Sequence, residues 1–174
     1  MLKKSTTEII DDIIHHRADI GLVILDEHLL EKKPSLSYER LLEGRLVVGV
    51  SKKSPLALSK SITPEELLLQ PIVLYKDDYL KSFAERFESK YGSFNMLFHT
   101  NNTVAIQKAV AEGFAATVGL DFSFNLSADT TIVELSLPDQ PHVYLGWISN
   151  QEKKLPKASQ LFINKLKYEL NKSQ

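Results

Sequence analysis

Hydrophobic residues along this chain alternate between two spacings. Ile9, Ile10, Ile13 and Ile14 recur as on one face of a helix, whereas 18–25 is an almost continuous apolar run, typical of a strand covered on both faces. Further strands are expected at 45–51, after a polar stretch at 26–40, and at 71–75, 96–100, 115–119, 132–135 and 143–148. Further helices are expected over 63–69, 80–91, 103–112 and 156–170. This alternation predicts an α/β fold with mostly parallel sheets flanked by helices.

The composition excludes several classes of protein. With 174 residues, 43% of them hydrophobic and 25% charged, the chain suits one domain or two small lobes rather than a disordered tail. Lys and Arg number 21 against 22 Asp and Glu, so no overall basic field marks a nucleic-acid binder. The absence of cysteine excludes disulfides, thiolate nucleophiles and cysteine metal sites.

The sequence also bears on where the protein works. No stretch approaches the roughly 20 apolar residues that a membrane span requires. Lys3 and Lys4 are not followed by the apolar run of a secretory signal. We therefore expect a cytoplasmic protein.

Motifs for catalysis and cofactor binding are missing from the sequence. It contains no nucleophile elbow, phosphate-binding loop or dinucleotide fingerprint, and its five histidines have no HxxxH or HExxH spacing. We expect no catalytic residue, no metal site and no cofactor. The titratable groups that an enzyme could use are His99 and the pair Asp77 and Asp78, but the pair fits the acidic start of a helix.

Two helix starts are encoded locally. Ser5 and Glu8 have the spacing of a capping box, in which each residue's side chain binds the other's backbone N–H. Thr63 has the features of a second start, with Pro64 at the first helical position and acids in the first turn.

Polar residues at two helix openings are candidates for ligand binding. Ser5 and Thr6 open the first helix, and Asn101, Asn102 and Thr103 open the helix that follows the strand at 96–100. In α/β sheets ligands collect beside helix N-termini, where free N–H groups and the helix dipole favour an anion. The same residue types are preferred helix caps, and a residue can both cap a helix and touch a ligand.

Six segments of the sequence occur in an order that is characteristic of one protein family. They are 5–22, 46–57 with Ser54-Pro55-Leu56-Ala57, 62–67, 71–74, 101–115 with Val110-Ala111-Glu112-Gly113, and 155–158. In this order they resemble the effector-binding domain of LysR-type transcriptional regulators.

The resemblance implies a two-lobed fold of the type 2 periplasmic-binding-protein kind. The first lobe would comprise 1–48 plus 134–174 and the second 49–133, joined by two crossover strands. A small effector, by the chemistry of the helix openings an organic anion, would bind between the lobes. The resemblance assigns the effector contacts to Ser5, Thr6, Ser51, Thr100, Asn101 and Asn102. Homodimers or tetramers are implied, with DNA bound only through a helix-turn-helix domain absent from this chain.

The chain departs from the family pattern at two places. Ala115 stands where the family usually has its second glycine, and 119–121 replaces a proline-bearing stretch, so the second-lobe wall of the site is expected to differ. The family places a winged helix-turn-helix, a linker helix and the first strand and helix of lobe one before Ser5. We therefore expect an incomplete first lobe, whose exposed strand edges favour dimerisation or aggregation.

Two other functions remain open at this point. A solute-binding protein of a transporter would have the same fold, although the missing secretory signal argues against it. An enzyme on this fold would need a catalytic cluster around His99 or the pair Asp77 and Asp78.

Overall fold

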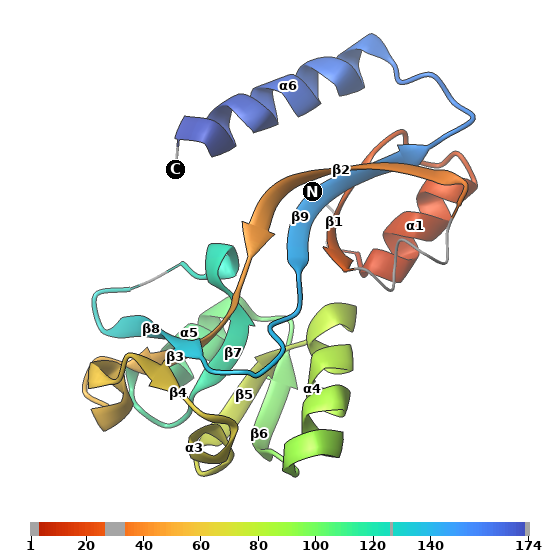
Figure 1. Ribbon diagram of the computed structural model, residues 1–174. Coiled ribbons are helices and arrows are strands. Elements are labelled where there is room, and N and C mark those ends of the chain that lie inside the picture. The colour runs from red at the N-terminus through yellow and green to blue at the C-terminus, as the bar shows by residue number, and fades with distance from the viewer. Residues whose placement is uncertain (1–3, 27–33, 126, 173–174) are drawn as a thin grey trace. The chain divides into compact units, whose positions relative to one another are not determined.

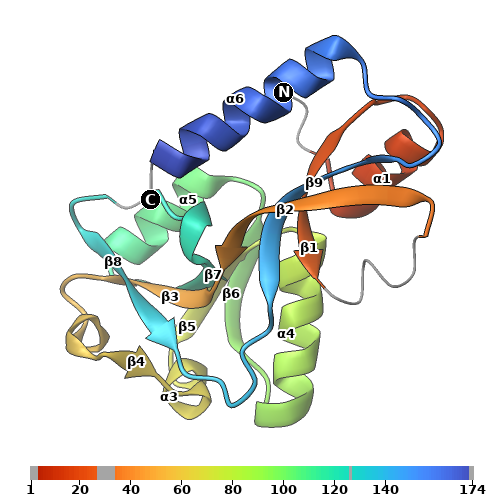
Figure 2. The same cartoon turned by 45° about the horizontal axis from the view of Figure 1, so that its top comes forward.

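The computed structural model describes residues 4–26, 34–125 and 127–172. The chain divides into two compact units, whose elements are drawn in Figure 1 and Figure 2. Unit 1 comprises Met1–Gly44 and Pro141–Gln174, and unit 2 comprises Arg45–Gln140.

Unit 1 is built on a three-stranded antiparallel sheet. Its elements are α1 (Thr6–Ile14), β1 (Gly21–Asp26), β2 (Leu36–Gly44), β9 (Val143–Asn150) and α6 (Lys157–Lys172). β9 lies between the other two strands, in the order β1-β9-β2, and pairs antiparallel with both. α1 packs against β1 and β9 (Figure 1).

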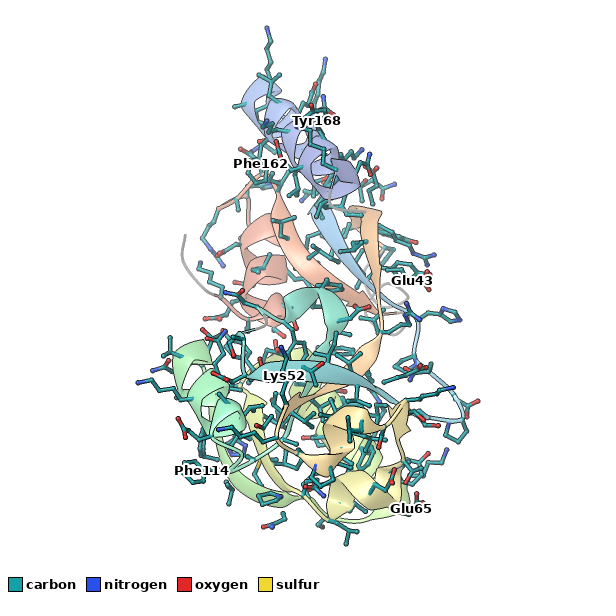
Figure 3. All side chains as sticks on the ribbon, turned by 90° about the vertical axis from the view of Figure 1, so that its left-hand side faces the viewer. Glu43, Lys52, Glu65, Phe114, Phe162 and Tyr168 are labelled. Atoms are coloured by element: carbon teal, nitrogen blue, oxygen red, sulfur yellow. The ribbon has the colours of Figure 1, made fainter. Side chains whose placement is uncertain are left out.

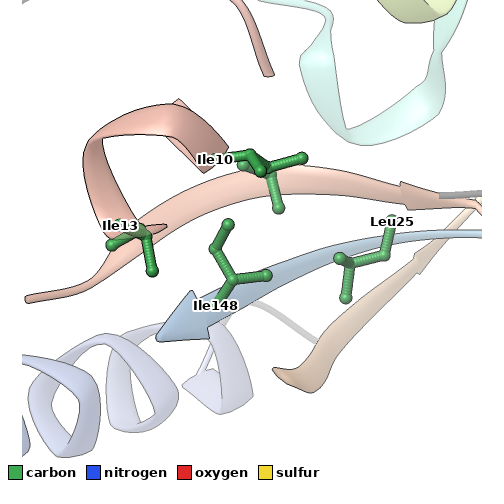
Figure 4. Close-up of a cluster of buried hydrophobic side chains, with 5 residues drawn as sticks. Ile10, Ile13, Leu25 and Ile148 are labelled. Atoms are coloured by element: carbon green, nitrogen blue, oxygen red, sulfur yellow. The ribbon is translucent and has the colours of Figure 1, made fainter. Parts of the chain in front are cut away.

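A hydrophobic cluster fills the space between α1 and the sheet of unit 1 (Figure 4). Ile10 and Ile13 are three residues apart on α1, so they share one helix face. They are buried together with Val23 and Leu25 of β1 and Ile148 of β9. The predicted isoleucine stripe is therefore the face that anchors α1 to its sheet.

Both predicted helix starts are confirmed. Ser5 Oγ accepts a hydrogen bond from the Glu8 N–H at 3.2 Å, and the Glu8 carboxylate accepts one from the Ser5 N–H at 2.7 Å. Thr63 and Glu66 make the same reciprocal pair at 3.2 and 2.8 Å. These bonds satisfy backbone donors that a helix N-terminus otherwise leaves unpaired.

Unit 2 contains two sheets. Its strands are β3 (Leu46–Ser51), β4 (Ser61–Ile62), β5 (Pro71–Tyr75), β6 (Asn95–Thr100), β7 (Thr117–Leu120) and β8 (Thr130–Leu135). Its helices are η1 (Pro55–Leu58), α3 (Pro64–Leu68), α4 (Asp78–Tyr91), α5 (Thr103–Ala111) and η2 (Asp121–Ser123). One sheet has the order β4-β8-β3-β7 and the other pairs β5 with β6, with a parallel bridge from Ile72 to Ala116 between them.

The α/β class is confirmed, but the expected predominance of parallel strands is corrected to mixed sheets. β5 with β6 and β4 with β8 are parallel, whereas β9 pairs antiparallel with β1 and β2, and β3 pairs antiparallel with β7 and β8. An apolar run reports that a strand is buried, not which way its partner runs. The direction depends on partners far away in the sequence, as for β3 and β8.

Some large apolar side chains stay exposed. Phe114 of unit 2 and Phe162 and Tyr168 of α6 are 68%, 51% and 54% exposed, and Figure 3 labels them. On α6, Leu161 is also 60% exposed, while Ile163 is buried. Within the described residues, no helix combines the length and the apolar character needed to cross a membrane.

Candidate functional site

Unit 2 contains a pocket of about 310 Å³. Its lining comes from segments that are far apart in the sequence and that the sheets and α5 bring together. The lining residues are Gly49, Tyr75, Asp77, Leu80, Thr103, Ile106, Gln107, Val110, Thr117, Val118, Gly119, Ser123, Phe124, Asn125, Thr130 and Thr131. This volume lies at the lower end of the range for small-molecule sites.

Two glycines let an aromatic ring form one wall of the pocket. A Cβ atom on Gly49 would lie 2.5 Å from Cε1 of Phe124, and one on Gly119 would lie 2.8 Å from its Cε2. These glycines lie on the neighbouring strands β3 and β7. The Phe124 ring therefore occupies the space that two side chains would fill, an example of close approach at a strand glycine.

Two buried threonines of the pocket differ in their hydrogen bonds. Thr117 and Thr130 are 6% and 8% exposed. Thr130 Oγ1 accepts a hydrogen bond from the Ser127 N–H at 3.1 Å and lies 3.1 Å from the Ser127 hydroxyl. Within the part of the chain that the structure describes, the Thr117 hydroxyl has no hydrogen-bond partner. Its oxygen is not among the fully buried side-chain atoms that lack a partner, so the hydroxyl keeps some accessible surface and can meet a ligand.

Asp77 brings a carboxylate to the pocket. It is the N-cap of α4 and accepts a hydrogen bond from the Leu80 N–H at 2.7 Å, which confirms the predicted role at a helix start. Burial raises the pKa of Asp77, and the neighbouring charge of Asp78 raises it further. Among the described residues that line the pocket, Asp77 is the one charged side chain, and none is Lys, Arg or His.

Replacing Asp77 by asparagine tests the cost of this carboxylate. Because the folded-state pKa lies above the unfolded value, the stability falls as the pH rises from the unfolded pKa through the folded pKa of this partly buried carboxyl, and the loss is complete above it. Asn caps a helix about as well as Asp, so Asp77→Asn removes the charge and keeps the cap. We expect the difference in unfolding free energy between variant and wild type to grow in favour of the variant as the pH rises above about 4, where the unfolded carboxyl ionises, measured by urea denaturation.

The control for this pH series is Asp78→Asn, which changes an exposed neighbour. Its difference from wild type should vary less with pH than that of Asp77→Asn. A pH-independent difference for Asp77→Asn would contradict the assignment of a partly buried carboxyl with a raised pKa.

Three of the predicted site residues lie together at the start of α5. Thr100 ends β6, and its Oγ1 accepts a hydrogen bond from the Asn102 N–H at 3.1 Å. Asn102 Oδ1 in turn accepts from the N–H groups of Val104 and Ala105 at 3.0 and 3.2 Å, so its role as a cap is confirmed. Asn101 is exposed between them. The next residue, Thr103, is the one at this helix start that lines the pocket.

The other three predicted residues lie elsewhere. Ser5 and Thr6 open α1 in unit 1. Ser51 is buried, and its Oγ donates to the Ala111 carbonyl at 3.2 Å and accepts from the Lys53 N–H at 3.3 Å. Ala111 ends α5, so Ser51 lies near the opposite end of this helix from Asn102, roughly 13 Å away along the axis at about 1.5 Å per residue.

Sequence reasoning missed the pocket itself, since none of the six predicted residues lines it. One signal was present: isolated glycines at positions 49 and 119 inside apolar strands indicate close approach of another group. His99, the other candidate for enzyme chemistry, is exposed on β6 and is not among the lining residues. The described residues contain no group of three or more metal-ligating side chains.

Solved structures with a similar fold are regulators or their regulatory domains. HinK, a LysR family transcriptional regulator from Pseudomonas aeruginosa, matches with a TM-score of 0.77 at 18% identity, over 97% of this chain and 59% of HinK. The regulatory domain of Synechocystis PCC6803 CcmR, in complex with 2-PG, matches with a TM-score of 0.73 at 19% identity, over 95% of this chain and 79% of the CcmR domain. The effector-binding domain of QuiR, in complex with shikimate, matches with a TM-score of 0.71 at 18% identity, over 92% of this chain and 76% of the QuiR domain.

These likenesses show the fold, and the chain spans about 59% of the length of the full regulators such as HinK. A search of curated proteins found no significant match. The sequence pattern of one family, described as the LysR substrate binding domain, matches residues 2–171. This match covers nearly the whole chain and agrees with the family resemblance carried by its six segments. The chain therefore belongs to the family of LysR substrate binding domains.

Proposed function

We propose that this chain is the small-molecule effector-sensing domain of a bacterial LysR-type transcriptional regulator. The family match over residues 2–171 carries the proposal. The pocket in unit 2 supports it, because an effector needs a partly apolar hollow with a few polar groups. The complexes of QuiR with shikimate and of CcmR with 2-PG are examples of small molecules held by domains of this fold.

The mechanism that we propose is a shift between arrangements of two lobes. Unit 1 would correspond to the first lobe and unit 2 to the second, with boundaries after Gly44 and Gln140 rather than the residues 48 and 133 of the sequence prediction. An effector that binds one arrangement better than another shifts their populations. In the full regulator this shift would change how attached helix-turn-helix domains sit on DNA.

Other properties of the regulator follow from this proposal. A domain that controls DNA binding must work in the cytoplasm, where bacterial DNA lies. We also propose self-association into a homodimer or tetramer, supported by the exposed Leu161 of α6. Phe162 and Tyr168 of the same helix are exposed too (Figure 3).

Catalysis and transport are the alternatives to sensing. The similar solved structures are regulators and regulatory domains, and the family is named for its place in LysR proteins, which favours a regulator over the solute-binding protein of a transporter. We propose that the chain is not an enzyme, because His99 does not share the pocket with Asp77. The carboxylate and hydroxyl groups of the pocket, without a histidine beside them, suit the recognition of a ligand rather than catalysis.

The proposed effector contacts are Ser5, Thr6, Ser51, Thr100, Asn101 and Asn102, with a small organic anion as the class of effector. The dipoles of α1 and α5 favour a negative group at both helix starts. Asn101 and Asn102 are exposed at the start of α5, which leaves their amides accessible.

Thermal unfolding of the chain with a panel of small acids, including shikimate, 2-PG, benzoate and succinate, tests this function. A ligand that binds only the folded state at 100 times its Kd adds about 2.7 kcal/mol. For a chain of this size that raises the midpoint by roughly 5 to 10 °C. We expect at least one acid to do so, whereas no shift with any acid would contradict the proposal.

The variant Asn102→Asp then tests the contact at α5. Aspartate caps as well as asparagine, so the fold should be kept while a negative charge is added at the proposed anion site. We expect the stabilising acid to bind about tenfold more weakly or worse. Asn95→Asp, an equal charge change at the exposed start of β6, is the control and should leave affinity within about twofold. Equal losses in both variants would remove Asn102 from the site.

A further inference from the structure

We propose that the pocket of unit 2 admits an uncharged, partly apolar group that carries a hydroxyl, and that Thr117 hydrogen-bonds this hydroxyl. The inference rests on the proposed sensing function, and it names the class of ligand group that enters this pocket. It separates the pocket from the helix starts, where the negative group of an effector is expected.

The first support is the unpartnered hydroxyl of Thr117. Thr117 is 6% exposed as a residue and lines the pocket, and its hydroxyl oxygen is not among the fully buried atoms that lack a partner. Thr130 lines the same pocket, is buried to a similar degree, and has its hydroxyl bonded to Ser127. The fold thus satisfies one buried threonine and, among the described residues, leaves the other for a partner from outside the protein.

The second support is the charge of the lining. The described lining residues include the carboxylate of Asp77 and no cationic side chain. An acid group inside the pocket would lose its hydration and face a like charge without a counter-ion. An uncharged hydroxyl or ring avoids both costs.

The third support is the shape and polarity of the walls. Ile106, Val110, Val118 and Phe124 supply apolar surface on several sides. The volume of about 310 Å³ exceeds the roughly 150 Å³ of an apolar cavity that holds benzene. A six-membered ring with a hydroxyl therefore fits, and its ring buries apolar surface while its hydroxyl reaches a polar partner.

Methyl NMR of the 174-residue chain with two probes of the same ring tests the inference. Benzyl alcohol carries an uncharged hydroxyl. Benzoate carries a carboxylate attached directly to its ring, so its ring cannot enter the pocket while the charge stays outside the pocket. We expect benzyl alcohol to shift the methyl signals of Thr117, Val110 and Val118 saturably, with benzoate at least tenfold weaker at these methyls. Benzoate binding there as tightly as benzyl alcohol would overturn the inference.

The variant Thr117→Val and its matched control Thr130→Val test the role of the hydroxyl. Valine keeps the shape of threonine, so Thr117→Val should leave the thermal midpoint unchanged or higher and weaken benzyl alcohol about threefold to tenfold. Thr130→Val breaks bonds within the protein and should lower the midpoint. If Thr117→Val lowers the midpoint as much as Thr130→Val, or leaves benzyl alcohol affinity unchanged, the inference is wrong.

These outcomes are independent of the test for sensing. The proposed function fails if no acid of the panel stabilises the chain, whatever benzyl alcohol does. The pocket inference fails on the two probes and the threonine variants, even where an acid binds at the helix starts.

Discussion

Replacing Ile13 by alanine is expected to lower the free energy of unfolding of unit 1 by about 2–5 kcal/mol. Ile13 is 0% exposed and belongs to the cluster of Ile10, Leu25 and Ile148 that joins α1 to its sheet. Removing its outer methyl groups loses apolar burial and leaves a cavity that β1 and β9 cannot close. Urea denaturation followed by the fluorescence of Trp147, the single tryptophan of the chain and a residue of β9, reports this unit directly.

The neighbouring Ile14→Ala is the matched control. Ile14 has the same side chain on the same helix but is only partly buried at the edge of the cluster. The decrease in the free energy of unfolding caused by Ile14→Ala should be less than half of that caused by Ile13→Ala. Equal losses would mean that α1 does not present the face shown in Figure 4 to the sheet.

Gly146→Ala is the second substitution with a large expected effect. A Cβ atom at this position of β9 would lie 2.7 Å from the carbonyl oxygen of Glu39 and would also overlap the side chain of Leu25. Glu39 is on the neighbouring strand β2, and Leu25 is fully buried, so neither can move away freely. We expect the free energy of unfolding to fall by about 1–3 kcal/mol. Urea denaturation followed by the fluorescence of Trp147 again measures it.

Gly21→Ala provides the comparison for this strand substitution. Its added methyl would overlap the Cγ2 methyl of Ile9, which is only partly buried, and its nearest neighbours are all side-chain atoms rather than backbone. Gly21 pairs with Ile148 in the same sheet, so both variants add one methyl group to one sheet. A smaller loss for Gly21→Ala is expected, and the reverse order would contradict the tight packing of β9 against β2.

Features encoded by neighbouring residues could be predicted from the sequence. The capping boxes at Ser5 and Thr63 depend on a partner three residues later, so the sequence alone contains the whole interaction. The cap at Asn102 follows the same logic. The isoleucine stripe of α1 likewise shows its buried face in its spacing.

The strand β2 could not be predicted because its polar residues find partners far away in the sequence. Residues 36–40 look like part of a polar link, yet Glu39 accepts a hydrogen bond from Trp147 Nε1 at 3.1 Å, and the Arg40 guanidinium lies 4.5 Å from the Tyr144 ring centre. Both partners are on β9. The strand therefore depends on cross-strand pairs that no local pattern contains.

The candidate site also has one part that could be predicted from neighbouring residues and one part that could not. The polar helix starts at Ser5 and Asn102 were visible locally, because capping residues and anion-binding residues are of the same types. The pocket was not, because Gly49, Thr117 and Phe124 come together only through the pairing of β3 with β7 and the turn that follows β7. Its chemistry is a property of the folded unit.

The central claim is that the folded chain binds a small effector, and calorimetric titration of the chain with each acid of the panel tests it most directly. We predict that at least one acid gives saturable heat with one site per chain, and that the same acid raises the thermal midpoint. The acid should be recovered unchanged afterwards, as befits a sensor. Absence of saturable heat for every acid, at concentrations up to about 1 mM, where binding is worth only about 4 kcal/mol, would contradict the account.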